Sequence, residues 1–167
     1  MLAEYEKQQI EREHIRRESR LTMALCQVLL ATIVLYALAA AFLLPDRGMP
    51  GKAVRDAWEA LNIAAIALVV IVLAVRKTIY FSPRLVRDDF TLQALLRRWR
   101  AIDIVFLALA EAVALFGLAI ALAGMPFRQT FHFFVAGFLL ALINMPVAFK
   151  VRDKIRLFEK YAGKSIL

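Results

Sequence analysis

The chain has 167 residues, of which 62% are hydrophobic, and it carries a formal net charge of +8. Soluble domains of this size hold about 45–50% apolar residues; here the excess falls into blocks, which excludes an ordinary soluble domain and favours a membrane protein. Cys26 is the lone cysteine, so no internal disulfide can form. His14 and His132 are far apart in the sequence, and no metal or cofactor is therefore predicted.

Residues 1–20 form a charged arm, predicted to be a cytoplasmic helix. Five glutamates alternate there with five lysines and arginines, and Glu13 and Arg17 stand at a spacing that supports a helix. Two interpretations stay open. The arm either continues the first membrane helix into solvent, or it contacts a partner or a neighbouring copy.

Four apolar blocks follow, at residues 21–44, 58–75, 101–124 and 130–149. Each is close to the ~20 residues that cross a ~30 Å hydrocarbon core, and in lipid the backbone must satisfy its own hydrogen bonds, which favours helices. The first block exceeds the ~7–15 apolar residues of a signal peptide, so we expect it to be retained. The sequence predicts an all-α fold, an integral membrane four-helix bundle of two hairpins over residues 21–149, with cytoplasmic amphipathic helices.

Basic segments lie between and after these blocks. The run Arg97-Arg98-Trp99-Arg100 places an indole among cations, which is typical of the lipid headgroup region. The tail, residues 150–167, has an apolar stripe among basic residues and is predicted to be an amphipathic helix on an anionic leaflet, or else a solvated extension. The residues expected to contact headgroups are Arg97, Arg98, Trp99, Arg100, Lys150, Arg152, Lys154 and Arg156.

The distribution of positive charge predicts the orientation. With four spans, eighteen of the 22 lysines and arginines fall on one side of the membrane. The positive-inside rule then places both termini in the cytoplasm, in a bacterial inner membrane. We interpret the charge as contact with anionic inner-leaflet lipids and expect no nucleic acid as a partner.

Glu111 lies halfway along the third block, where an ionisable group is costly to desolvate and is a functional-site hypothesis by default. Thr32, at a comparable depth on the first block, is the predicted hydroxyl partner, and the two form a candidate ion-binding pair. A carboxyl group alone in lipid is expected to keep its proton. Glu111 then serves either as a hydrogen-bond donor, within the bundle or to a neighbour, or as a proton or cation carrier.

Other polar side chains also fall within the blocks. Asp103 lies nearer the cytoplasmic face, where it is expected to be hydrated or paired with Arg100. Asn62 and Asn144 are expected to make interhelical hydrogen bonds, worth ~0.6–2 kcal/mol each, rather than to bind a ligand. His132 is expected to be a histidine of the helix interface rather than a proton relay. A stripe of small residues lies on the same block as Glu111 and predicts close helix packing, within the chain or between copies. It consists of Ala110, Ala114, Gly117 and Ala121.

The run from Leu109 to Leu122, Leu-Ala-Glu-Ala-Val-Ala-Leu-Phe-Gly-Leu-Ala-Ile-Ala-Leu, resembles the ion-carrying helix of the proteolipid c subunits of vacuolar and archaeal-type rotary ATPases. The resemblance implies that Glu111 binds a transported proton or sodium ion. Residues 30–38 repeat the run weakly, as in proteolipids built from a duplicated hairpin. The whole chain is similar to small four-span bacterial membrane proteins, a resemblance that implies no activity.

The sequence shows no nucleophile–base pair and no phosphate-binding loop from which to build a catalytic site, so we expect no enzyme. The favoured hypothesis is a non-enzymatic accessory or scaffold subunit of a larger membrane complex, or a self-assembling bundle. Its expected partners are membrane lipids and other membrane subunits or copies of itself. The alternative is a proton- or cation-translocating subunit that uses Glu111.

Overall fold

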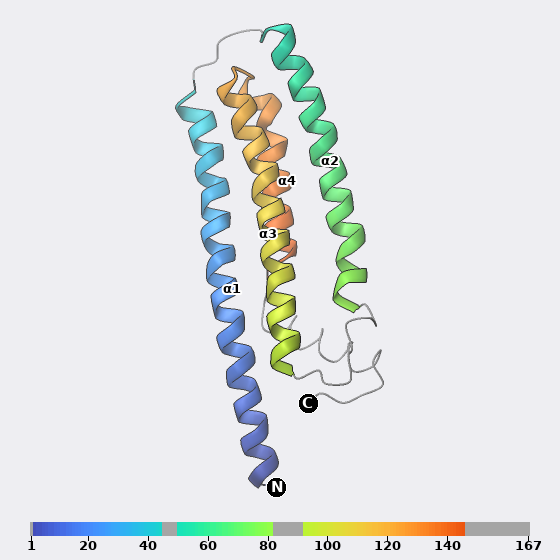
Figure 1. Cartoon of the computed structure of the whole chain (residues 1–167). Helices are drawn as coiled ribbons and strands as arrows, with labels where there is room; N and C mark the ends of the chain where they lie inside the picture. The colour runs from blue at the N-terminus through green and yellow to red at the C-terminus, as the bar shows by residue number, and fades with distance from the viewer. Residues whose placement is uncertain (1, 45–49, 82–91, 146–167) are drawn as a thin grey trace.

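The computed structural model describes residues 2–44, 50–81 and 92–145. They form an all-α bundle, as the sequence predicts (Figure 1). Its helices are α1 (Leu2–Phe42), α2 (Lys52–Phe81), α3 (Leu92–Leu122) and α4 (Phe127–Ile143). Helix α1 is continuous through both the charged arm and the first apolar block.

Helices α3 and α4 form the central pair of the bundle, and α1 and α2 flank it from opposite sides (Figure 1). Helix α1 packs on both α3 and α4, whereas α2 packs mainly on α3. Consecutive helices usually pack as neighbours, but α1 and α2 pack on the α3–α4 pair instead of forming a tight hairpin of their own.

A Schellman turn joins the two central helices. Gly124 takes a left-handed conformation with φ of 102°, which suits glycine because it has no Cβ. Its backbone N–H donates to the carbonyl of Ala121 at 3.0 Å, and the N–H of Met125 donates to the carbonyl of Ile120 at 3.1 Å. Met125 and Ile120, at the positions where this motif commonly has an apolar contact, are both buried. The chain therefore reverses within a few residues, and α4 runs back along α3.

Within the part of the chain that the structure describes, three helical segments are long and apolar enough to cross a membrane: Arg20–Phe42, Lys52–Arg76 and Arg97–Leu122. The predicted fourth span differs from the structure. Helix α4 is apolar but has 17 residues, beginning before Thr130 and ending at Ile143. Pro146 follows closely in the sequence, and a proline disfavours helical conformation in the residue before it. Residues 146–149 and the tail lie outside the described part of the chain.

The outer surfaces of α1 and α2 are apolar. Large aliphatic side chains such as Leu35 on α1 and Ile63 and Ile66 on α2 are exposed. An apolar surface of this extent is unusual for a monomeric soluble protein, and it suits contact with lipid chains or with other membrane helices. The best-buried of the three membrane-length helices is α3, which lies at the centre of the bundle.

Candidate functional site

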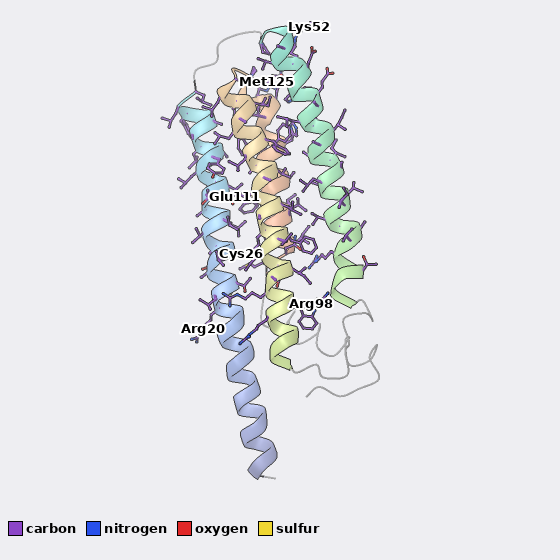
Figure 2. The ribbon with its side chains drawn as sticks, viewed as in Figure 1. Arg20, Cys26, Lys52, Arg98, Glu111 and Met125 are labelled. Atoms are coloured by element: carbon purple, nitrogen blue, oxygen red, sulfur yellow. The ribbon has the colours of Figure 1, made fainter. Side chains whose placement is uncertain are left out.

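Glu111 lies at mid-height on α3, between Arg98 near one end of the helix and Met125 beyond the other (Figure 2). It is half-buried, and its Oε1 atom accepts a hydrogen bond from the hydroxyl of Tyr36 on α1. The two oxygens are 3.4 Å apart, whereas a strong O–H···O bond measures about 2.7–2.8 Å. The carboxyl group is therefore loosely held at the junction of α1 and α3.

Thr32, the predicted hydroxyl partner, does not hydrogen-bond to Glu111 in the structure, and its role in ion binding stays a prediction. Its hydroxyl donates to the backbone carbonyl of Val28 on its own helix at 2.9 Å, which is a common arrangement for a threonine in a helix interior. Tyr36, one turn further along α1, takes its place because the longer side chain reaches across to α3. The sequence could have identified Tyr36 as a candidate, because it carries a hydroxyl group within an apolar block.

The small-residue stripe packs within the chain, against α4. Ala110, Ala114, Gly117 and Ala121 are all buried. A Cβ atom placed on Gly117 would lie 2.8 Å from the Cβ of Phe133, a separation that real Cβ atoms essentially never show. The stripe thus lets two backbones approach closely, and it is already occupied by α4.

The predicted interhelical hydrogen bonds form near the α3–α4 turn. Asn62 Oδ1 on α2 pairs with His132 Nε2 on α4 at 2.5 Å. Trp58 Nε1 donates to the backbone carbonyl of Gln129 at 3.2 Å, and the Trp58 ring meets the imidazole of His132 edge-on. These contacts tie α2 to α4, whereas the hydrogen bond of Glu111 joins α3 to α1.

The opposite end of the bundle departs from several expectations. Asp103 is only 5% exposed, so the expectation that it is hydrated is wrong, while its pairing with Arg100 stays a prediction. Trp99 is buried in the hydrophobic core and does not point outward to headgroups. Arg97 and Arg98 are exposed, and their contact with headgroups stays a prediction.

Asn144 and Arg76 both donate hydrogen bonds to carbonyl groups at the C-terminal end of α4. Asn144 Nδ2 donates at 2.8 Å to the carbonyl of Leu140 on its own helix. The interhelical bond expected of Asn144 is not seen among the residues that the structure describes. Arg76 Nη2 on α2 donates at 3.0 Å to the carbonyl of Ile143, one of the last carbonyls of α4. A cation near the carbonyl end of a helix is favourable because that end carries partial negative charge.

Within residues 2–44, 50–81 and 92–145, no three His, Cys, Asp or Glu side chains come together as metal ligands. The four predicted headgroup contacts of the tail lie outside this part of the chain; they are Lys150, Arg152, Lys154 and Arg156. The structure thus brings together Glu111 and Tyr36, and separately Asn62 and His132.

Comparisons of the chain with protein-family models, with curated proteins and with solved structures find no match.

Proposed function

We propose that this chain is a non-enzymatic membrane subunit that assembles, with other membrane proteins or with copies of itself, over the surface around Glu111. The observation that carries the proposal is the state of this carboxyl group, which is half-buried at mid-bundle and held by one long hydrogen bond to Tyr36. An ionisable group is costly at that depth when it faces lipid. A neighbouring helix that covers Glu111 and offers a hydrogen-bond partner removes that cost.

The packing of the flanking helices supports the same proposal. The small-residue stripe is used inside the chain, so a partner meets the outer faces of α1 and α3 rather than the stripe. We call the junction of α1 and α3 at Glu111 the seam. Exposed aliphatic side chains flank it along both helices: Leu115 lies one turn after Glu111, Ile104 about two turns before it, and Leu35 beside Tyr36. They supply apolar area around a central polar contact, which is a common plan for helix association in lipid.

The proposed setting is a bacterial inner membrane, crossed four times, with both termini in the cytoplasm. The end of the bundle that carries Arg20 and Arg98 lies opposite the end that carries Lys52 and Met125 (Figure 2). Among the described residues, most lysines and arginines belong to the helix segments at the first end, which the positive-inside rule assigns to the cytoplasm. Exposed Arg97 and Arg98 there suit anionic lipid headgroups.

The test compares two substitutions of Glu111 in the full chain, extracted gently and examined by native mass spectrometry. Glu111→Gln keeps the assembly, because the amide can still donate a hydrogen bond, whereas Glu111→Leu weakens it. Glu59→Leu is the matched control, since Glu59 is exposed on α2 outside this seam. Wild-type assembly in Glu111→Leu, or a wild-type protein that is monomeric at all concentrations, contradicts the proposal.

The second candidate function is proton or cation translocation by Glu111. It is favoured by a half-exposed carboxyl group with a phenol hydroxyl in reach, together with the local resemblance to proteolipid c subunits. This function requires that dicyclohexylcarbodiimide labels Glu111 in membranes at near-neutral pH, and absence of labelling at every accessible pH contradicts it. If Glu111→Gln assembles normally but abolishes a measured proton or sodium flux, translocation replaces the scaffold proposal.

A further inference from the structure

Gln27 is a polar side chain on the outer surface of α1, within the segment Arg20–Phe42 that is long and apolar enough to cross a membrane. It lies seven residues after Arg20, which is about 10 Å along the helix. The side chain is exposed, and no group among the residues that the structure describes hydrogen-bonds to its amide. An amide without hydrogen bonds is costly in hydrocarbon. A hydrogen-bonding partner from outside the chain would remove that cost.

The side of α1 that carries Gln27 differs from the sides that meet the central helices. Tyr36, which reaches Glu111 on α3, stands nine residues after Gln27. Nine residues make two and a half turns, so these two side chains lie on opposite sides of α1. Cys26 is fully buried, and its thiol donates to the carbonyl of Ala141 on α4 at 3.7 Å. Gln27 therefore faces away from the seam and does not share the side that packs on α4.

The neighbours of Gln27 on its own side of the helix are small. Ala24 lies one turn before it and Ala31 one turn after it, and both are exposed. Alternating steps of three and four residues are typical of the contact stripe of a left-handed helix pair, and alanines let a second backbone approach closely. We call the exposed residues at these steps the Gln27 face; they are Ala24, Gln27, Ala31, Val34, Leu38 and Ala41.

The amide of Gln27 is complementary in charge to a second copy of itself. Its N–H groups carry partial positive charge and donate, whereas its carbonyl oxygen carries partial negative charge and accepts. Two copies with the same orientation in a membrane, related by a two-fold axis along the membrane normal, place their Gln27 side chains opposite each other at the same depth. Each amide then donates to the other. One polar residue in an otherwise apolar stripe also fixes the register of the pair.

We propose that the Gln27 face binds the same face of a second copy of this chain, so that two α1 helices pack in parallel around a hydrogen-bonded pair of Gln27 side chains. This contact lies on the opposite side of α1 from the seam. It goes beyond the assembly proposed at Glu111 and does not depend on it, because one copy can be in contact with neighbours on both sides of α1.

The first experiment tests the geometry with single cysteines in a Cys26→Ala background, in membranes that contain the full chain. Oxidation with copper phenanthroline is expected to join two copies through Ala24→Cys, which lies on the Gln27 face. Leu25→Cys is the matched control: it is exposed and at nearly the same depth, but about 100° further around the helix and away from the Gln27 face. The Ala24→Cys cross-link is expected to persist when Glu111→Leu is added.

The second experiment measures the strength of the contact by energy transfer between labelled copies in vesicles, over a series of protein-to-lipid ratios. Gln27→Leu is expected to raise the dissociation constant of the pair about three- to thirtyfold, which corresponds to ~0.6–2 kcal/mol for an interhelical hydrogen bond. Val28→Leu, one residue away and outside the Gln27 face, is expected to leave it unchanged. Because Gln27 and Val28 are exposed, neither substitution disturbs the core.

Three results overturn the proposal. The first is equal cross-linking through Ala24→Cys and Leu25→Cys, or none through either. The second is an unchanged dissociation constant in Gln27→Leu, which assigns the amide to water at the membrane surface. The third is cross-linking of Ala24→Cys to a different membrane protein and never to a second copy. If Glu111→Leu assembles as the wild type does while Ala24→Cys still cross-links, the proposed function fails and this inference stands.

Discussion

Gly137 lies so close to α3 that a Cβ atom at this position would stand 2.7 Å from the backbone oxygen of Ala110. A backbone carbonyl cannot move aside as a flexible side chain can, so this contact fixes the distance between the two central helices. The same close approach sets the register of α4 along α3. Several consequences of the packing can be measured directly.

Gly137→Val is expected to destabilise the bundle, because the added side chain forces α3 and α4 apart. Overpacking of a close contact costs about 1–3 kcal/mol, and the loss of neighbouring contacts adds to this. The measurement is the change in the free energy of unfolding in mixed micelles. Gly51→Ala is the control, since a Cβ there meets nothing within 4 Å. Equal stabilities of the two variants would contradict the close approach.

Tyr36→Phe removes the hydroxyl that reaches Glu111 and leaves the ring in place. The expected loss of stability is small, about 0.6 kcal/mol or less, because the hydrogen bond is long. The carboxyl group loses its partner within the chain, so its rate of modification by dicyclohexylcarbodiimide should rise. Thr32→Val, on the same helix, should leave that rate unchanged. A rate that responds to Thr32→Val rather than to Tyr36→Phe would reinstate Thr32 as the partner.

Asn62 and His132 should be energetically coupled, since their side chains hydrogen-bond between α2 and α4. A double-mutant cycle with Asn62→Leu and His132→Leu is expected to give about 0.6–1.7 kcal/mol of coupling. Because the two substitutions remove the same hydrogen bond, the double variant loses less stability than the two single variants together. Additive losses would mean that the pair contributes nothing to the docking of α2.

The two ends of the bundle should differ in their access to a membrane-impermeant thiol reagent added to intact cells. In a Cys26→Ala background, Lys52→Cys is expected to react from outside, and Arg98→Cys only after the cells are opened. Both positions are exposed, so access to the reagent decides the result rather than burial. The wild-type chain is a useful control, because Cys26 is fully buried and should react slowly in either case. The reverse pattern would invert the proposed orientation.

The sequence predicted the helices well, because a helix that crosses the hydrocarbon core needs an apolar segment of matching length, and that length can be counted in the sequence. It also predicted the small-residue stripe as a packing surface. Depth along each helix could be counted from the sequence, and this placed Glu111 correctly at the middle of α3 (Figure 2). The direction in which a side chain points around the helix axis could not be predicted in this way.

Rotation about the helix axis explains most of the differences. Asp103 and Trp99 are four residues apart and share one face of α3, and this face turns into the bundle, so both are buried where exposure was expected. Thr32 and Tyr36 are also four residues apart on one helix. Tyr36 hydrogen-bonds to Glu111 and Thr32 does not, because the tyrosine side chain is longer. Helix α4 ends at Ile143 with Asn144 as its C-terminal cap, although the apolar pattern of the sequence continues to Phe149, so the pattern alone could not predict this end.

The placement of α1 and α2 on either side of the α3–α4 pair has a consequence for biosynthesis. Helices α1 and α2 leave the ribosome before α3 and α4, on which they pack, have been synthesised. Until then, each lies in the bilayer without its native neighbours. The bundle can therefore assemble only after the C-terminal half, which contains α3 and α4, has been synthesised. A chain truncated before Leu92 would lack α3 and α4 and would leave two inserted helices with little to hold them together. Quality-control proteases that recognise unassembled membrane segments should remove it.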